Sequence, residues 1–349
     1  MLGMFEDRGE GALAQQVLVL VYAVIAVAGM VLPLFAHRFG GVRSTMVCAA
    51  ATYVVFILAV ACSKRDTMLG AAALLGIGGT MLWATMSRIV VAYGNSAWQG
   101  RSFAAINVAT SIAIAIGNKG FHELWTGIGN ATLFICAAAA GCGIGFFLLL
   151  PTERLEDAVG KREVKQSCGV HGWGVAFALL ALHCCNATWG GSINGGLMLF
   201  GQKKYGEAWI NLISLTPLVN CAAALGGGWL TDRIGGVRAL AWSYATFFIG
   251  VVLIARFHES VLGYGTGACI VAAAHGAIYA AVTGSIKKFL NARWQKIVCY
   301  GLSTSGALAI VVALLVSRMP VEITFGLLIG AGAVGCVVVG AMAWVVKSD

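Results

Sequence analysis

Two histidines, His183 and His275, lie within long apolar runs where titratable side chains are rare. His275, Tyr279 and Thr283 stand four residues apart, so they share one face if the run is helical. Asn186 follows His183 in the same apolar run. Imidazoles in such surroundings can bind a polar solute or carry protons, or they can only hydrogen-bond to neighbouring helices. The residues leave both interpretations open.

A second polar line runs through residues 102–118. Asn107, Thr110, Ser111 and Asn118 recur there at helical spacing on one face. Such side chains either line a cavity or join helices by hydrogen bonds. From both regions we take as candidate cavity or substrate residues Asn107, Ser111, His183, Asn186, His275 and Tyr279.

Other kinds of chemistry have no visible candidates. The sequence shows no Ser-His-Asp arrangement, no paired carboxylates and no Cys-x-x-Cys pair with a nearby Cys or His partner. The glycine runs at 76–79 and 226–228 lie within apolar stretches and lack the Lys-Ser/Thr of a phosphate-binding loop. We therefore expect no enzyme, no metal site and no cofactor.

Composition indicates the elements that must position the candidate residues. Of the 349 residues, 59% are apolar and only 11% are charged. A soluble core cannot absorb that much apolar surface, so we expect an all-α polytopic membrane protein in contact with a lipid bilayer. Charged residues leave eleven intervals, each long enough for one helix of about 17–25 residues. Two of these spans are expected near 172–199 and 207–230.

The net charge of +9 fits this topology better than it fits nucleic-acid binding. Alternate loops of a multi-pass protein face the same side of the membrane. The side that holds the two Gly-Gly-Val-Arg loops carries 15 of the 23 Lys and Arg residues. The positive-inside rule makes that side cytoplasmic. Eleven spans then leave the N-terminus outside and the C-terminus in the cytoplasm.

The chain contains an internal repeat. Residues 37–43 match residues 232–238 at an offset of 195, and Trp98-Gln99 recurs as Trp294-Gln295 at an offset of 196. Each Gly-Gly-Val-Arg copy lies between two apolar runs, where paired glycines permit a tight reversal. We therefore expect an N-terminal bundle of five spans at 1–150, a charged cytoplasmic linker at 151–171 and a C-terminal bundle of six spans at 172–349.

The second copy carries a family resemblance. Gly-x-Leu-x-Asp-Arg-x-Gly-x-x-Arg at 228–238 resembles the loop signature of the major facilitator superfamily, which implies a two-bundle carrier. The first copy departs from it at Pro33 and His37. The usual fold has twelve helices, so by this count the first is missing: either the chain begins at an internal Met, or it is a true eleven-span variant. The expected gating motif comprises Gly228, Asp232, Arg233, Gly235, Gly236 and Arg238, with Arg38, Gly40, Gly41 and Arg43 in the first copy.

The resemblance also implies a role for Asp232. At the C-terminal end of a helix the dipole disfavours an anion, so the carboxylate needs a cation or another helix's N-terminus. In the superfamily this residue faces a helix of the other half, which here opens at Gly100-Arg101-Ser102. We expect Asp232 to bind there as a latch between conformations, with Arg233 and Arg238 nearby. The alternative is a hydrated loop carboxylate.

One branch of the superfamily is a closer match. Gly76, Gly78, Leu82 and Trp83, followed by Gly117-Asn118, resemble the uncoordinated-93-like branch of ion channel regulatory proteins, although the usual Gln-Gly is absent. Two functions follow. The chain is a carrier that moves a small neutral or polar solute by alternating access, or it is a regulatory or trafficking partner of another membrane protein.

Overall fold

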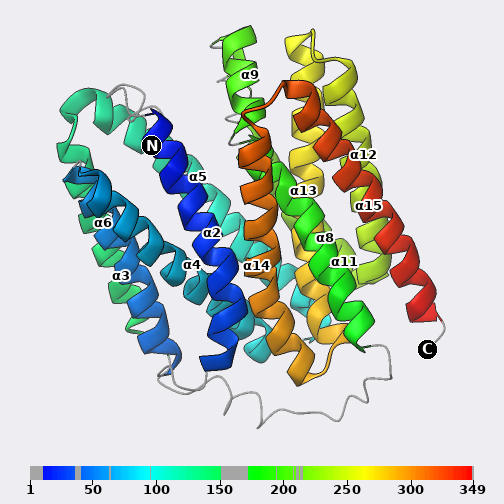
Figure 1. Ribbon diagram of the computed structural model, residues 1–349. Coiled ribbons are helices and arrows are strands. Elements are labelled where there is room, and N and C mark those ends of the chain that lie inside the picture. Colours follow the sequence, from blue (N-terminus) through cyan, green and yellow to red (C-terminus); the bar gives the residue numbers. More distant parts are fainter. Residues whose placement is uncertain are drawn as a thin grey trace. The chain divides into compact units, whose positions relative to one another are not determined.

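The structure is a computed structural model, and it describes residues 11–35, 41–62, 64–94, 96–150, 172–193, 195–206, 208–209, 212 and 215–347. Within these ranges every regular element is a helix (Figure 1). Helices suit this composition because they satisfy all backbone hydrogen bonds within one segment, as hydrocarbon requires. The predicted linker at 151–171 lies outside the described residues, so the division into halves around it stays a prediction.

Each of the eleven predicted spans corresponds to a helix, which confirms the all-α multi-pass fold. Among the described residues, seven helices are both long and apolar enough to cross a membrane. These are α2 (Gly11–Phe35), α3 (Val42–Ala61), α4 (Arg65–Tyr93), α12 (Gly236–Arg256), α13 (Val261–Phe289), α14 (Ala292–Val316) and α15 (Val321–Lys347). The other four spans are α5 (Gln99–Ile128), α6 (Ala131–Phe147), α8 (Gly172–Ile193) and α11 (Thr216–Ile234).

Two of the predicted span boundaries are wrong. The span near 172–199 is two helices, because α8 ends at Ile193 and a separate α9 occupies Gly196–Tyr205. The glycines at this break weaken the helix and allow close contact with the end of α14: a Cβ on Gly195 would lie 2.9 Å from Ser317 Cβ. The span expected from residue 207 begins as α11 at Thr216, with a proline in its first turn.

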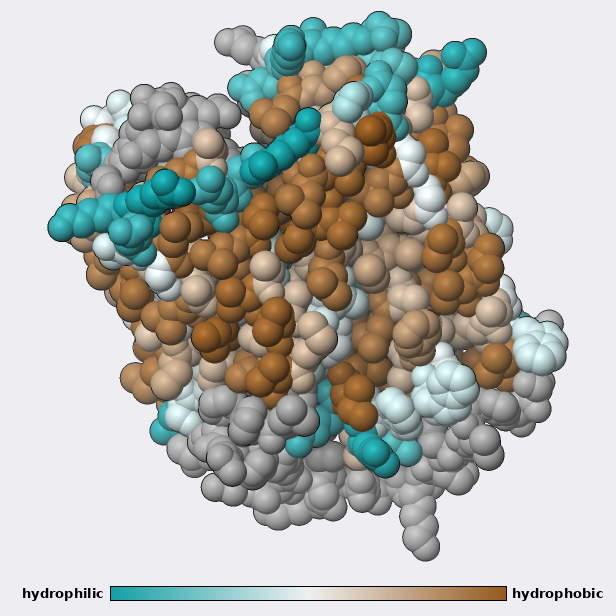
Figure 2. Space-filling model, viewed as in Figure 1, coloured by the Kyte–Doolittle hydropathy of each residue, from teal (hydrophilic) through white to brown (hydrophobic). Residues whose placement is uncertain are grey.

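The chain divides into two compact units. Unit 1 comprises Met1–Ala92, Ile116–Glu163 and Cys299–Ala307, and unit 2 comprises Tyr93–Ala115, Val164–Val298 and Leu308–Asp349. The first part of α5 therefore belongs to unit 2, while a segment of α14 belongs to unit 1. In each unit the helices show mostly hydrophobic side chains on the face drawn in Figure 2, with hydrophilic residues toward the helix ends.

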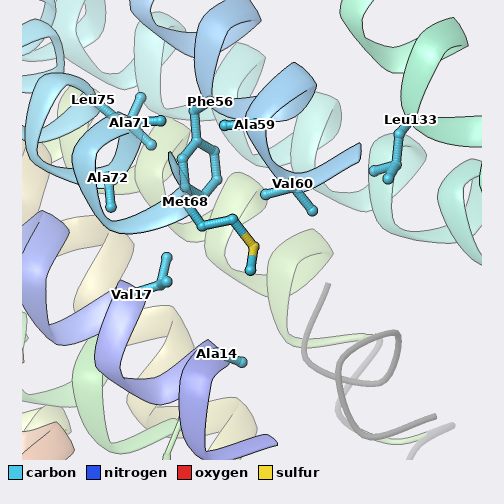
Figure 3. Packing of buried hydrophobic residues seen from close by; sticks show 10 residues of the cluster. All are labelled: Ala14, Val17, Phe56, Ala59, Val60, Met68, Ala71, Ala72, Leu75 and Leu133. Carbon is cyan, nitrogen blue, oxygen red and sulfur yellow. The ribbon is translucent and has the colours of Figure 1, made fainter. Parts of the chain in front are cut away.

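The core of unit 1 joins α2, α3, α4 and α6. Figure 3 shows Met68 of α4 between Phe56 and Val60 of α3 and Val17 of α2, and Met68 and Val60 are fully buried. In unit 2, α13 packs against α8, α11 and α12, and α15 packs against α8 and α12. Helix α13 is therefore central to unit 2, and the candidate residues His275 and Tyr279 lie on it.

The Gly-Gly reversal at 235–236 uses its two glycines differently. Gly235, between α11 and α12, has a φ of 92°, a conformation that favours glycine. Gly236 begins α12, and its Cα lies so close to Ser285 of α13 that a side chain there would overlap the hydroxyl. One glycine thus permits the turn and the other permits helix contact. In the first copy, Gly41 precedes α3 with a φ of −59°, and residues 36–40 lie outside the described residues.

Candidate functional site

The carboxylate of Asp232 binds the N-terminus of α5 within unit 2. Asp232 Oδ1 accepts a hydrogen bond from Gly100 N at 2.9 Å, and Oδ2 accepts from Arg101 N at 3.1 Å and from Arg101 Nε at 3.2 Å. The first amides of a helix lack partners within that helix, so an anion placed there is stabilised. Only 3% of the Asp232 side chain is exposed. We call this contact the Asp232 latch; the contact is as expected, and its gating role stays a prediction.

Two cations lie close to the Asp232 carboxylate. Arg101 contributes the guanidinium contact, and Lys288 Nζ of α13 lies 3.5 Å from Oδ1. Arg233 instead lies over the ring of Trp229, with 5.0 Å from Cζ to the ring centroid. Arg238 is exposed. The expectation that Arg233 and Arg238 lie near the carboxylate stays a prediction.

Three glycines allow α5, α11 and α13 to meet at the Asp232 latch. A Cβ on Gly228 of α11 would lie 2.7 Å from Gly100 O, and a Cβ on Gly284 of α13 would lie 2.8 Å from Gly100 Cα. A real Cβ does not approach other atoms so closely. The first glycine of the 228–238 motif therefore serves backbone contact, which brings Asp232 within reach of the α5 amides.

The first copy of the repeat makes a different contact in unit 1. Arg43 Nε donates to Leu150 O at 2.7 Å, at the residues that follow α6. Gly41 O accepts from the hydroxyls of Ser44 and Thr45. Arg38 and Gly40 lie outside the described residues. In the described part of this copy, Arg43 therefore satisfies a carbonyl beyond the end of a helix.

A group of amides and a hydroxyl connects three helices of unit 2. Asn107 Nδ2 and Ser111 Oγ of α5 donate to Asn220 Oδ1 of α11, at 3.1 and 3.4 Å. Asn220 Nδ2 in turn donates to Ala272 O of α13 at 3.3 Å. Asn220 lies twelve residues before Asp232 on α11, about 18 Å of helix rise. We call Asn107, Ser111 and Asn220 the amide cluster.

The remaining four candidates meet between α8 and α13. His275 Nδ1 lies 3.0 Å from Asn186 Oδ1 and 3.2 Å from Asn186 O, so this nitrogen carries the proton and donates. Asn186 Nδ2 donates back to His275 O at 3.3 Å. The rings of His183 and Tyr279 lie 6.0 Å apart between centroids. His183 Nδ1 is buried and has no hydrogen-bond partner among the described residues. These four residues form the histidine cluster.

The structure thus brings the six candidates together as two groups that share α13, rather than as one. Thr110 and Thr283 were part of the same polar lines, but each donates to a carbonyl of its own helix, Ile106 O and Tyr279 O. The side chain of Asn118 lies outside the described residues. Sequence reasoning missed Asn220 and Lys288, although a single Asn inside the apolar run at 215–230 is itself an unusual signal.

These groups provide hydrogen-bond donors and acceptors without a fixed charge. Each amide nitrogen of the amide cluster and the Ser111 hydroxyl donates a hydrogen bond, whereas His183 Nδ1 has no partner among the described residues. An imidazole can accept a hydrogen bond from a polar solute or take up a proton. The histidine cluster is therefore the better candidate for reversible binding, and the amide cluster is better suited to joining helices.

This arrangement of long apolar helices defines a multi-pass membrane protein, and the comparisons with known proteins agree. The sequence profile of the Major Facilitator Superfamily matches residues 2–293. The chain belongs to this superfamily. No individual curated protein matches the chain in sequence.

Solved structures of several transporters are similar in fold. The human organic anion transporter MFSD10 (TETRAN) superposes with a TM-score of 0.70 at 16% identity, covering 94% of this chain and 82% of that one. A variant of the E. coli fucose:proton symporter FucP gives 0.71 at 11% identity, with 97% and 92% covered. A bacterial homologue of the iron transporter ferroportin, in an outward-facing state, gives 0.72 at 11% identity, with 98% and 92% covered. At these identities the likeness concerns the fold.

Proposed function

We propose that this protein moves a small neutral or polar solute across a membrane by alternating access. The Asp232 latch carries the proposal. It joins α5, from the predicted N-terminal half, to α11 and α13 of the C-terminal half through a buried carboxylate. A contact of this kind stabilises one conformation and must break for the halves to rock into another. The C-terminus and the Gly-Gly-Val-Arg turns would face the cytoplasm.

The solute class follows from the groups in the histidine cluster. A charged solute bound within the membrane needs a fixed opposite charge, because an unpaired ion there is costly. Asn186, His183, His275 and Tyr279 instead provide neutral hydrogen-bonding groups and aromatic surface. A polar, uncharged molecule with hydroxyl or amide groups fits these partners best, and His183 Nδ1 would be its first contact.

Uptake into proteoliposomes tests the proposal. Purified protein is reconstituted and offered labelled L-fucose, neutral amino acids and nucleosides, with protein-free liposomes as the blank. We expect saturable uptake of at least one solute, and a loss of about tenfold or more with Asn186→Leu, because a buried hydrogen-bonding partner disappears. Thr110→Val is the matched control, since that hydroxyl bonds only its own helix, and it should transport normally.

The regulatory alternative gives a different result. A cysteine placed at Asn107 in a cysteine-free background should react with a membrane-impermeant reagent from both sides if access alternates. Reaction from one side only, together with no uptake of any solute offered, contradicts the carrier proposal and favours an uncoordinated-93-like partner of another membrane protein. Gly76 and Gly78, which carry that resemblance, pack closely in unit 1: a Cβ on Gly76 would lie 2.6 Å from Val24 Cβ.

A further inference from the structure

Helix α9 is a separate segment at the end of unit 2 remote from the Asp232 latch. It follows the break after α8 and ends at Gly206, whose φ of 58° terminates the helix. It packs against α8 and α15 and lies beside the turn between α12 and α13 (Figure 1). That turn comes at the far end of α12 from Gly236, about 31 Å away for a helix of 21 residues.

Aromatic contacts attach α9 to this turn and to its neighbours. The ring of Phe200 lies 5.6 Å from that of Tyr264 on α13 and 6.2 Å from that of His258 in the turn. Tyr264 donates its hydroxyl hydrogen to Leu197 O of α9 at 3.2 Å, and Tyr205 donates to His258 O. These contacts hold α9 whatever the pH, because none of them needs a charged group.

Charged groups form a second attachment at the same place. Lys204 Nζ of α9 lies 2.7 Å from Glu259 Oε2, and His258 Nε2 lies 3.1 Å from Glu259 Oε1. His258 Nδ1 lies 2.7 Å from Ala255 O, one of the last carbonyls of α12. Carbonyl and carboxylate oxygens only accept, so both contacts are hydrogen bonds only when both ring nitrogens of His258 donate.

We propose that Lys204, His258 and Glu259 form a pH-sensitive clasp that seats α9 on the α12–α13 turn. Protonated His258 aligns the Glu259 carboxylate, which then holds Lys204. Neutral His258 keeps Nδ1–H on Ala255 O and turns a lone pair at Nε2 toward the carboxylate, which removes one hydrogen bond and adds repulsion.

The position of the two residues favours this charge state. A cation near the C-terminus of α12 and an anion just before the N-terminus of α13 both interact well with the helix dipoles. The hydrogen bond from Lys204, followed by its charge, lowers the pKa of Glu259. The carboxylate therefore stays ionised below the ordinary range of a glutamic acid. The clasp is strongest when His258 is protonated and Glu259 is ionised, it loosens when His258 becomes neutral, and protonation of Glu259 removes it.

Other charged residues near the turn do not replace these three. Arg256 ends α12 and Glu322 lies in the first turn of α15, which presents Phe325 to the His258 ring at 5.5 Å. Neither makes an ion pair with another residue that the structure describes. Glu207 lies outside the described residues. The titration of His258 thus acts on α9 through Glu259 and Lys204.

Hydrogen–deuterium exchange of the full-length protein in nanodiscs tests the clasp without a solute. Peptides covering 197–206 are compared at pH 6 and pH 8, with labelling times scaled for the intrinsic exchange rates. We expect about two- to fivefold slower exchange of α9 at pH 6, the size expected for a partly exposed charged pair. Peptides covering 98–103, which contain no histidine and lie at the Asp232 latch, serve as the internal control and should show no difference.

Two variants locate the effect. His258→Gln should make α9 exchange equally fast at both pH values, and so should Glu259→Gln, which leaves the imidazole in place. Unchanged exchange of peptides covering 98–103, at the Asp232 latch, shows that each variant is folded. No pH effect in the wild type, or an effect that survives either substitution, would overturn the clasp. Any consequence for solute entry rests on the proposed transport function, which this experiment does not require.

Discussion

Unit 2 holds a carboxylate at each end of its helices, and the two differ in what surrounds them. The Asp232 side chain is 3% exposed and accepts from two backbone amides and a guanidinium. The Glu259 side chain is 76% exposed and contacts two flexible or titratable side chains. Backbone donors cost no side-chain entropy and are little screened when buried, whereas exposed pairs contribute little and respond to salt.

The Asp232 latch is thus a firm contact, and the Lys204–His258–Glu259 clasp is an adjustable one. The Asp232 latch depends on three glycines that bring whole helices together, so it is either formed or broken. The Lys204–His258–Glu259 clasp adds to aromatic contacts that persist without it, so it can only alter how often α9 leaves its place. Substitutions at the two ends should therefore differ in size and in their dependence on salt.

The largest effect is expected from Gly228→Ala. Its Cβ would lie 2.7 Å from Gly100 O and 2.8 Å from Ala104 Cβ, so α5 and α11 must separate. Overpacking of this kind costs about 1–3 kcal/mol, and the thermal midpoint in detergent should fall. Gly226→Ala, two residues earlier on α11, is the matched control because nothing lies within 4 Å of its Cβ position. Equal midpoints for the two variants would show that the glycine contact does not hold the helices.

A smaller but more local effect is expected from Asp232→Asn. The amide keeps one acceptor but turns its NH₂ group toward the donors of Gly100 or Arg101, at a cost of about 1.5 kcal/mol, within the lower half of the range for an unpaired buried group. Exchange of peptides covering 98–103 should therefore accelerate about tenfold or more. Asp66→Asn, in the exposed first turn of α4, should leave the same peptides unchanged. Wild-type exchange in Asp232→Asn would mean that the carboxylate does not secure the α5 terminus.

Sequence patterns predicted the positions of the helices better than they predicted which side chains meet between helices. Apolar runs located all eleven spans, and the motif at 228–238 indicated both the turn and the contact of Asp232 with the α5 terminus. The break at residues 194–195 was missed because the apolar run continues across it, and only the glycines there indicate an interruption.

The partners of the polar residues could not be read from spacing. Helical periodicity shows which residues share a face, as for Asn107 and Ser111, but the rotation of the opposing helix decides what that face meets. Asn220 of α11 is the common acceptor, and no pattern in its own helix indicates this. Likewise the motif at 228–238 does not indicate Lys288. This residue approaches Asp232 because α13 packs beside α5 and α11 at that contact.

The smallest effect is expected from added salt. Hydrogen exchange at α9 and at the Asp232 latch is measured in the same sample. At about 1 M NaCl the screening length falls to about 3 Å, which removes much of the attraction between exposed charges. At pH 6, peptides covering 197–206 should then exchange as fast in the wild type as in Glu259→Gln, while peptides covering 98–103 keep their low-salt rate. The reason is burial: solvent ions reach Glu259 but not the carboxylate of Asp232. Equal salt sensitivity at both ends would mean that the burial of Asp232 does not set the strength of its contact, and the distinction between a firm and an adjustable end would fail.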